Sequence, residues 1–248
     1  YKATFQITVP VGSTASFTYS IAPAGPQPPI TATGASITAT GGGNVTRDNL
    51  IKWVRGTNVQ GDDNPSLAAT AVRGYLHGDV LHSRPAVLNY NRLGQPDDRD
   101  LVVFYGSNAG VIHAVKGGQE NEDGVEKWGF IPSEFYTGFA RLYHQLPVIS
   151  SANPRTYFAD GPISLNAVYH QDTSTTPPTE RMEGVGAYAQ IYVGMRRGGR
   201  FYYSVDVTSP DVPVYKWKIT NSTPGFSELG QSWSEAKIVK LRLTTCPG

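Results

Sequence analysis

A turn and a tryptophan recur at nearly the same spacing in two parts of this chain, and this repeat limits the folds that are open to it. Gly106 precedes Trp128 by 22 positions, and Gly194 precedes Trp217 by 23. In both copies, short runs rich in Val, Ile, Tyr and Phe surround the turn, as is typical of strands. A repeat of this kind predicts one supersecondary unit that occurs twice.

The first copy predicts a unit of four antiparallel strands. Asn108 and Gly110 tolerate the positive φ of a tight turn, so they predict a hairpin here. Trp128 closes the unit with a large apolar side chain. The expected strands are residues 83–90, 101–107, 111–115 and 126–131. Four consecutive antiparallel strands make one blade of a β-propeller.

The spacing of the two copies predicts an interrupted propeller. They start 88 residues apart, about twice the usual blade period of roughly 40 to 50 residues. We therefore expect an insertion at about residues 132–179, including a short amphipathic helix, and the start of a third blade at residues 229–241. The expected fold class is mainly β: a quinoprotein-like β-propeller, incomplete in this chain, with about two to three blades, insertion loops and short helices.

The first 43 residues predict a separate part of the chain. Alternating apolar residues predict strands at 5–9 and 17–21, and a proline-, threonine- and glycine-rich stretch predicts an extended linker or loop over 22–43. The first residues already read as strand, and no methionine or apolar leader precedes Tyr1. We therefore expect a fragment of a longer protein.

Residues 44–248 form the expected propeller part. Thr46 predicts the N-cap of a short helix that contains Trp53 and ends before Gly56. The strands of the two blades follow this helix.

Composition and charge exclude several function classes. The 21 Lys and Arg residues nearly balance the 20 Asp and Glu residues, so we expect no nucleic-acid partner. Cys246 is the only cysteine, which excludes an internal disulfide and a cysteine-rich zinc site. No run approaches the roughly 20 apolar residues that span a bilayer, so we expect no transmembrane segment in this chain.

Seven short motifs occur in the order that is typical of the PilC/PilY family of type IV pilus tip-associated proteins, which the chain resembles. Each motif is weak alone, but their collinear order across roughly residues 49–243 is specific. The motifs are NLIKWVRG at 49–56, HGDVLHSRP at 77–85, YGSNAGVIHA at 105–114, WGFIP at 128–132, YFADGP at 157–162, GGRFYYSVDV at 198–207 and LGQSWS at 229–234.

The resemblance implies a fold, a function and a location. It implies the C-terminal propeller domain of a large exported protein that supports pilus assembly, counteracts retraction and contributes to adhesion. The implied partners are minor pilins or the pilus tip, and a host surface glycan or protein. The implied location is the bacterial cell surface, at the pilus tip or outer membrane, reached through the periplasm.

Two departures from the family pattern concern the loops. Ala109 stands where the family often has an aspartate, and the nine-residue calcium loop of alternating Asp and Asn that many members carry is absent. The cluster Asp97, Asp98 and Asp100 still offers hard oxygens for calcium, although three carboxylates need backbone carbonyls or water to complete six to eight ligands. The alternative interpretation is a solvated loop.

Three arginines predict a binding site on the second hairpin. Arg196, Arg197 and Arg200 flank a Gly-Gly pair. Their guanidinium groups suit an acidic glycan, a carboxylate or a partner pilin. The alternative is a hydrated turn.

Other polar and aromatic residues are expected to hold structure. Asp79, His82 and Ser83 do not predict a catalytic triad, because neighbours along a strand point to opposite faces. We expect an Asx turn at Asp160 and a packed, satisfied His113. The residues assigned to structure are Asp79, His82, Gly106, Asn108, Gly110, Trp128, Asp160, Gly194, Trp217 and Trp233.

The sequence favours a binding protein, with no catalytic residues and no certain cofactor. One alternative is a pyrroloquinoline-quinone dehydrogenase, which shares this blade style; such enzymes generally stack the cofactor on a vicinal disulfide, which one cysteine cannot form. Another alternative is a carbohydrate-binding propeller without a pilus role.

Overall fold

The computed structural model describes residues 14–21, 30–38, 46–59, 71–92, 98–119, 121 and 123–239, of which 14–21, 30–38 and 98 are described by their backbone alone. The chain forms two compact units. One unit comprises residues 1–74 and 140–148, and the other comprises residues 75–139 and 149–248.

The first unit contains a two-stranded sheet and a short helix. β1 (Thr14–Ile21) pairs antiparallel with β2 (Ile30–Thr38). β2 falls within the expected linker, so that prediction is wrong for these nine residues, whose Thr, Ile and Ala favour a strand. The strand expected at residues 5–9 lies outside the described residues.

The helix of the first unit begins where the sequence predicts. α1 (Arg47–Val54) is capped by Thr46, whose hydroxyl oxygen accepts from the Asn49 N–H at 3.2 Å, and Gly56 follows it with a φ of 98°. Trp53 contacts the edge of the Tyr143 ring, and the guanidinium of Arg73 lies 4.0 Å from its ring centre. The tryptophan therefore anchors an otherwise solvated helix.

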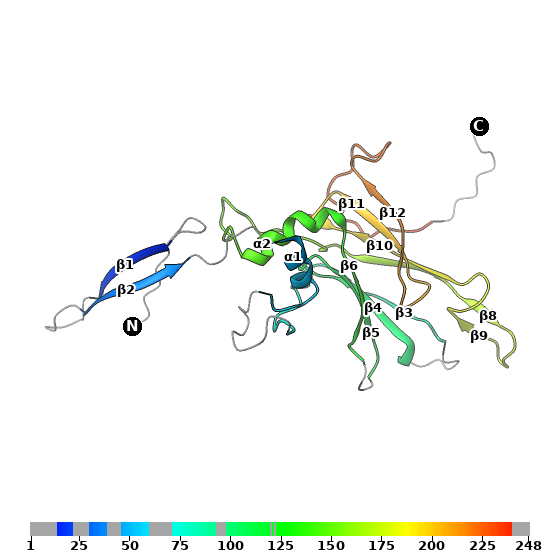
Figure 1. The fold of residues 1–248 in the computed structure, drawn as a ribbon. Helices are drawn as coiled ribbons and strands as arrows, with labels where there is room; N and C mark the ends of the chain where they lie inside the picture. Colours follow the sequence, from blue (N-terminus) through cyan, green and yellow to red (C-terminus); the bar gives the residue numbers. More distant parts are fainter. Residues whose placement is uncertain are drawn as a thin grey trace. The chain divides into compact units, whose positions relative to one another are not determined.

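The first sheet of the second unit is the expected four-stranded meander (Figure 1). A 3₁₀ turn, η1 (Asp98–Asp100), leads into its second strand. The β4–β5 hairpin closes through Gly110, whose φ of 85° is open to glycine at no steric cost. The strands, in spatial order, are β3 (Ala86–Asn89), β4 (Leu101–Gly106), β5 (Ile112–Lys116) and β6 (Glu126–Phe130).

The second sheet has the same order with one interruption. A small hairpin of β8 (His170–Asp172) and β9 (Thr179–Arg181) is inserted after its first strand, and the 3₁₀ turn η3 (Arg196–Gly198) follows its second. Its strands are β7 (Ile163–Val168), β10 (Tyr188–Gly194), β11 (Phe201–Asp206) and β12 (Val214–Thr220). β7 lies within residues 132–179, so the expected insertion contains a strand of the second sheet.

Strand register confirms that the two sheets are equivalent. In the first, Phe104 pairs with Ala114, which pairs with Trp128. In the second, Tyr192 pairs with Ser204, which pairs with Trp217. Both sheets carry an irregularity directly after the middle residue of this row, at Ala114 and at Ser204. The repeat therefore extends to a shared bulge, a feature that re-aims strands locally.

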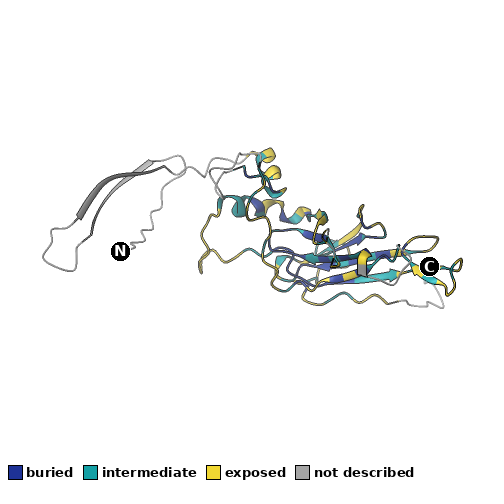
Figure 2. Ribbon diagram, turned by 90° about the horizontal axis from the view of Figure 1, so that it is seen from below, coloured by how far each residue is buried: buried dark blue, intermediate teal, exposed yellow. Residues whose placement is uncertain are grey.

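The core of the second unit lies between the two sheets, where Figure 2 shows buried strands beneath exposed loops. Phe130 meets the edge of the Tyr203 ring, and Tyr90 donates its hydroxyl to the Val207 carbonyl at 2.5 Å. Burial raises the pKa of Tyr90 well above its usual value. The fully buried apolar side chains include Leu88, Val102, Phe104, Ile112, Ile191, Val193 and Val205.

A short helical segment follows the first sheet, as expected between the copies. η2 (Ser133–Gly138) runs into α2 (Phe139–His144). Glu134 accepts from Lys218 Nζ at 2.7 Å and from the Tyr203 hydroxyl at 2.6 Å. Burial alone would raise the pKa of Glu134, but these hydrogen bonds outweigh it and hold the pKa below its usual value.

The structure shows a mainly β protein with two four-stranded sheets and no closed ring of blades in its described part. Residues 229–239, where a third blade was expected to begin, form no strand. The Ser232 carbonyl accepts from the Arg196 N–H at 3.2 Å, and the other backbone–backbone hydrogen bonds of this segment are local. None of the helices described here is both long and apolar enough for a bilayer crossing.

Candidate binding site

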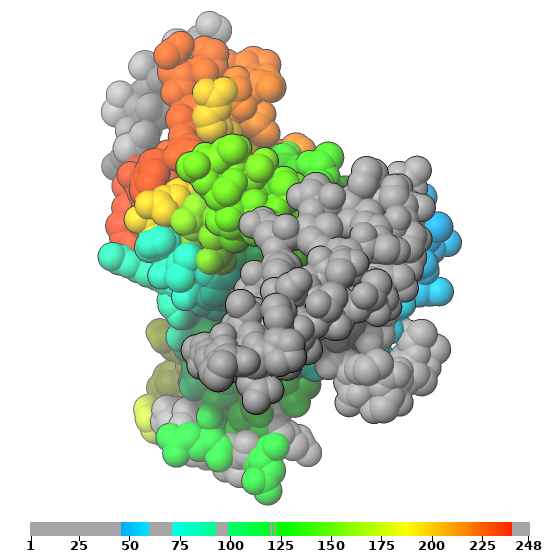
Figure 3. Space-filling view, turned by 90° about the vertical axis from the view of Figure 1, so that its left-hand side faces the viewer, coloured from blue at the N-terminus to red at the C-terminus, as the bar shows by residue number. Residues whose placement is uncertain are grey.

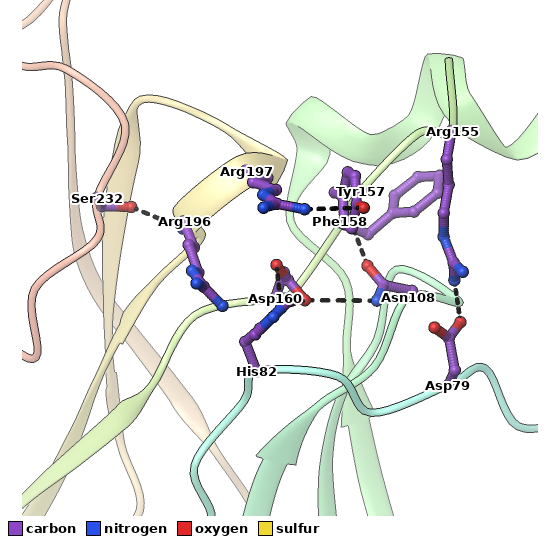
Figure 4. A network of polar contacts seen from close by, with 10 residues as sticks. All are labelled: Asp79, His82, Asn108, Arg155, Tyr157, Phe158, Asp160, Arg196, Arg197 and Ser232. Atoms are coloured by element: carbon purple, nitrogen blue, oxygen red, sulfur yellow. Dashed lines mark hydrogen bonds and ion pairs between the residues drawn. The ribbon is translucent and has the colours of Figure 1, made fainter. Parts of the chain in front are cut away.

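Residues 157–162, with the sequence YFADGP, lie between the two hairpin ends of the second unit (Figure 4). A Cβ at Gly198 would lie 1.7 Å from the Phe158 carbonyl oxygen, and a Cβ at Gly106 would lie 2.3 Å from that of Ala159. Only glycine permits such backbone approach. Both hairpins therefore touch this segment directly.

Asp160 is the buried centre of the polar network in Figure 4. Its carboxylate oxygens lie 3.0 and 3.1 Å from Nδ1 of His82, and Asn108 donates to it over a long 3.5 Å. An Asx turn was expected at Asp160, but the carboxylate instead binds two side chains distant in sequence. A buried carboxylate needs such partners.

Asn108 links the first hairpin to the same segment. Its backbone N–H donates to the Asp79 carbonyl at 3.0 Å, and its side-chain oxygen accepts from the Phe158 N–H at 3.0 Å. The sequence suggested that Asn108 supplies a positive φ, but Gly110 does so in this turn. Asn108 instead acts through its amide.

Asp79, His82 and Ser83 have three different partners. Asp79 forms an ion pair with Arg155, His82 with Asp160, and the Ser83 hydroxyl accepts from the Gly106 N–H at 2.8 Å. Residues 77–85 form no regular strand, contrary to the strand entry assumed from sequence. These three residues do not form a nucleophilic site.

A serine, histidine and glutamate do align elsewhere, in the first sheet. Nε2 of His113 lies 2.8 Å from the Ser107 hydroxyl, and its Nδ1 lies 2.5 Å from Glu126. The hydrogen bond with His113 holds the pKa of Glu126 below its usual value. The rings of His77, Tyr105 and His113 all contact one another, with the His113 ring stacked on each of the other two. Burial raises the pKa of Tyr105.

This alignment has the connectivity of a catalytic triad but lacks an accessible nucleophile. Ser107 is completely buried within the turn, so its hydroxyl cannot reach a substrate in this structure. His113 has a partner on each ring nitrogen. The arrangement satisfies buried polar atoms.

The arginines of the second hairpin lie among aromatic rings. Arg196, with a φ of 51°, places its guanidinium 4.7 Å from the ring centre of Trp233. Arg197 lies 5.0 Å from the ring centre of Tyr157 and donates to its hydroxyl at 2.9 Å. Arg200 is exposed and joins neither contact. The structure therefore groups Arg196 and Arg197, and leaves Arg200 outside.

A pocket of about 480 Å³ opens beside this cluster. Segments near residues 81–84, 196 and 233–235 adjoin on one face of the second unit, seen as cyan, yellow and orange-red in Figure 3. Ser232 fixes the turn by accepting from the Met195 N–H at 2.7 Å. The pocket is lined by Leu81, His82, Ser83, Arg84, Pro162, Arg196, Trp233 and Glu235.

The pocket carries unneutralised positive charge. Neither Arg84 nor Arg196 forms an ion pair with a carboxylate of the described residues, whereas Glu235 pairs with Lys237 at 3.0 Å. Trp233 remains 50% exposed. Unpaired guanidinium groups beside an exposed indole suit a ligand that is both anionic and partly apolar.

The proposed calcium ligands are only partly described. Asp97 lies outside the described residues, as does the side chain of Asp98. Both oxygens of Asp100 accept from Arg92, at 2.6 and 2.9 Å. Burial alone would raise the pKa of Asp100, but the bonds from Arg92 lower it. Arg92 thus supplies a cation at Asp100 already, and calcium binding in this loop stays a prediction.

The repeated glycine and tryptophan positions differ in their surroundings. Trp128 is half-buried and donates to the Pro210 carbonyl at 3.0 Å, whereas Trp217 is 38% exposed and contacts Tyr192. The sequence assigned both to a blade core, which the exposed Trp217 contradicts. A Cβ at Gly194 would lie 3.2 Å from the Ser232 carbonyl oxygen.

Sequence reasoning missed four residues of the site. Arg84, Arg155, Tyr157 and Glu235 stand within or beside the motifs, but none was singled out. The one available signal was composition, because arginine occurs in three of the seven motifs and an aromatic residue in six.

These observations define a class of protein: a mainly β protein with a repeated four-stranded unit, whose loops carry a cationic, aromatic pocket. Sequence comparison adds a distant relationship to the type IV pilus biogenesis factor PilY1 of Pseudomonas aeruginosa (strain UCBPP-PA14), with 27% identity over 184 residues. The aligned region covers 66% of this chain and 14% of that relative, so the chain spans a small part of its length. No family model matches the chain, and no solved structure is significantly similar.

Proposed function

We propose that this chain is part of a type IV pilus-associated surface protein, in which it acts as a binding platform. In this role it supports pilus assembly, counteracts pilus retraction and contributes to adhesion. The observation that carries the proposal is the distant relationship to PilY1, a biogenesis factor by name. The pocket on the loops supports a binding role, because loops on a rigid scaffold carry recognition.

The proposed architecture is a quinoprotein-like β-propeller of which these two sheets are consecutive blades. The shared register and bulge support it. So does the packing of one sheet on the next, with Phe130 against Tyr203. The proposed partners are minor pilins at the pilus tip and a host surface molecule, and the proposed location is the bacterial surface after export.

The test uses the complete natural protein in its own bacterium. Gly198→Val introduces a Cβ that would lie 1.7 Å from the Phe158 carbonyl oxygen, whereas a Cβ at Gly230 meets nothing within 4 Å, so Gly230→Val is the matched control. We expect Gly198→Val to reduce the number of surface pili in electron micrographs, and removal of the retraction motor to restore them. Immunoblots compare protein amounts.

A second strain resolves the case in which Gly198→Val folds normally. It lacks the coding segment for residues 149–239, all of which belong to the second unit. Normal pilus numbers in this deletion strain, with and without the retraction motor, would overturn the proposed function.

A carbohydrate-binding protein without a pilus role is the second candidate, favoured by the half-exposed Trp233 beside two arginines. Normal piliation of the deletion strain together with lost glycan binding would establish it. The proposed role is not enzymatic: alcohol oxidation in a dye-linked assay of the intact protein with pyrroloquinoline quinone and calcium would contradict it.

A further inference from the structure

We propose that the pocket beside Arg84, Arg196 and Trp233 binds an anionic glycan, with a sugar ring against the indole and its carboxylate or sulfate on the guanidinium groups. The inference rests on the proposed binding role and names the ligand class of that site. Its volume of about 480 Å³ falls within the roughly 300 to 1,000 Å³ of small-ligand sites.

The charges of the pocket favour an anion. Arg84 is exposed, and among the described residues Arg196 has only the Trp233 ring as a side-chain partner, so both guanidinium groups are available. Lys237 neutralises the one acidic lining residue, Glu235, at 3.0 Å. Arginine binds carboxylate and sulfate through paired N–H donors. Because its guanidinium group is planar and rigid, little side-chain conformational entropy is lost when these hydrogen bonds form.

The framework holds the cationic and aromatic groups in place. The Ser232 hydroxyl accepts from the backbone N–H groups of Met195 and Arg196, at 2.7 and 3.2 Å, and so ties the Arg196 turn to the segment that carries Trp233. His82, another lining residue, lies 3.0 Å from the buried carboxylate of Asp160. A preformed site loses less entropy when the ligand binds.

The walls of the pocket favour a sugar over a peptide. Extended peptides commonly bind by adding a strand to a free sheet edge. The lining residues come from segments 81–84, 162, 196 and 233–235, none of which is a strand. Trp233 instead offers an exposed apolar plane beside polar groups, which matches a sugar ring with an apolar face and an acidic substituent.

The experiment measures binding by the complete 248-residue chain with isothermal titration calorimetry. The probes are a short oligogalacturonate, which is carboxylated, a heparin-derived oligosaccharide, which is sulfated, a neutral oligogalactose and an acidic peptide. We expect saturable binding of at least one anionic sugar, weakened by salt, and none of the neutral sugar. Equal binding of the neutral sugar, preferred binding of the peptide, or no binding of either anionic sugar would overturn the inference.

Point variants distinguish the pocket from the general charge of the surface. We expect Arg84→Gln and Arg196→Gln each to weaken anionic-sugar binding about tenfold or more, the scale of a lost charged hydrogen bond. Arg200→Gln removes the same charge from the same hairpin outside the pocket, so it should change binding less than about twofold. Equal weakening by all three would show non-specific attraction and overturn the site.

Folding and function are separated by two further measurements. Circular dichroism and thermal melting verify each variant, and Arg84→Gln keeps the test valid if the turn at Arg196 fails to fold, because Arg84 is exposed. Pilus counts in the same variants separate the hypotheses. If the deletion strain has altered pili but the natural chain binds no anionic sugar, the proposed ligand is wrong and the proposed pilus role is supported.

Discussion

Phe104 and Trp128 in the first sheet occupy the strand positions that Tyr192 and Trp217 occupy in the second, but their surroundings differ. The second sheet covers the face with Phe104, which is completely buried. No described residue covers Trp217 to the same extent, and it remains 38% exposed. Equivalent positions in the repeat therefore have the same place in the sheet but contribute differently to stability, because burial depends on what packs against each copy.

Each sheet has a second face, opposite the one with Phe104 or Tyr192, and this face differs in polarity between the two sheets. In the second sheet, Val193 and Tyr203 face the first sheet and are buried. Their equivalents in the first sheet are Tyr105 and His113, which bind His77, Ser107 and Glu126. Polar residues occupy the face on which no other sheet of the described second unit packs, and apolar residues occupy the face on which one does.

Removing the central aromatic side chain should have the largest effect and the clearest difference between the sheets. We expect Phe104→Ala to lower the free energy of unfolding by about 4 kcal/mol, because it leaves a cavity in the core. Tyr192→Ala should cost about 1 kcal/mol, since Tyr192 is only half-buried. Urea unfolding followed by tryptophan fluorescence measures both, and equal losses would refute the difference in burial.

Charge pairs extend the comparison. Asp100→Ala leaves Arg92 without its carboxylate, and we expect a loss of about 2 kcal/mol. Lys216→Ala breaks the exposed 3.8 Å pair with Asp206 in the second sheet and should cost less than about 0.5 kcal/mol. A double-mutant cycle with Arg92→Ala isolates the pair energy by urea unfolding. A coupling near zero would show that Asp100 acts through something other than Arg92.

The two tryptophans should respond differently to the same conservative change. Trp128→Phe removes the N–H that donates to the Pro210 carbonyl, and we expect a loss of about 1.5 kcal/mol. Trp217→Phe removes no hydrogen bond found among the described residues and should cost about 0.5 kcal/mol or less. Thermal melting of both variants checks this order, and a larger loss at Trp217 would indicate that its face is covered in solution.

The pH dependence of stability should report on Glu126, which binds His113 on the polar face of the first sheet. Glu126 has a folded-state pKa below its ordinary value of 4.5, so its contribution to stability is present above that pH and is lost as the pH falls through the lower, folded-state value. Glu126→Gln should therefore make unfolding less sensitive to pH below about 4.5. The exposed Glu228→Gln is the control, and an identical pH profile for both variants would contradict the assignment.

The strands of the first sheet could be predicted from sequence because their apolar alternation and turn are local. β7 could not, because it pairs with β10 across the inserted hairpin of β8 and β9. Its place in the sheet depends on partner residues 20 to 30 positions away, from Val168 with Tyr188 to Ile163 with Val193. β2 was missed for a related reason. The proline-rich stretch before it favours a loop, and β2 is a strand because it pairs with β1.

The site was predictable in its residue types and not in its contacts. Arg196 and Arg197 stood out as a cluster, and Asp79, His82, Asn108 and Asp160 stood out as motif residues. His82 meets Asp160 across 78 positions, and Asn108 meets it across 52. These contacts form only because both hairpins pack against residues 157–162, and no local sequence pattern predicts that packing.

That segment has a consequence for how recognition by this surface can change. Residues 157–162 are pressed against both hairpin ends through main-chain atoms, with Gly106 and Gly198 at the contacts. Lengthening either hairpin would displace the segment and, with it, the other sheet. Diversification here is therefore confined to side-chain exchanges on a fixed frame, so a library that randomises Arg84, Arg196 and Trp233 should yield folded variants with new preferences more often than one that varies loop length.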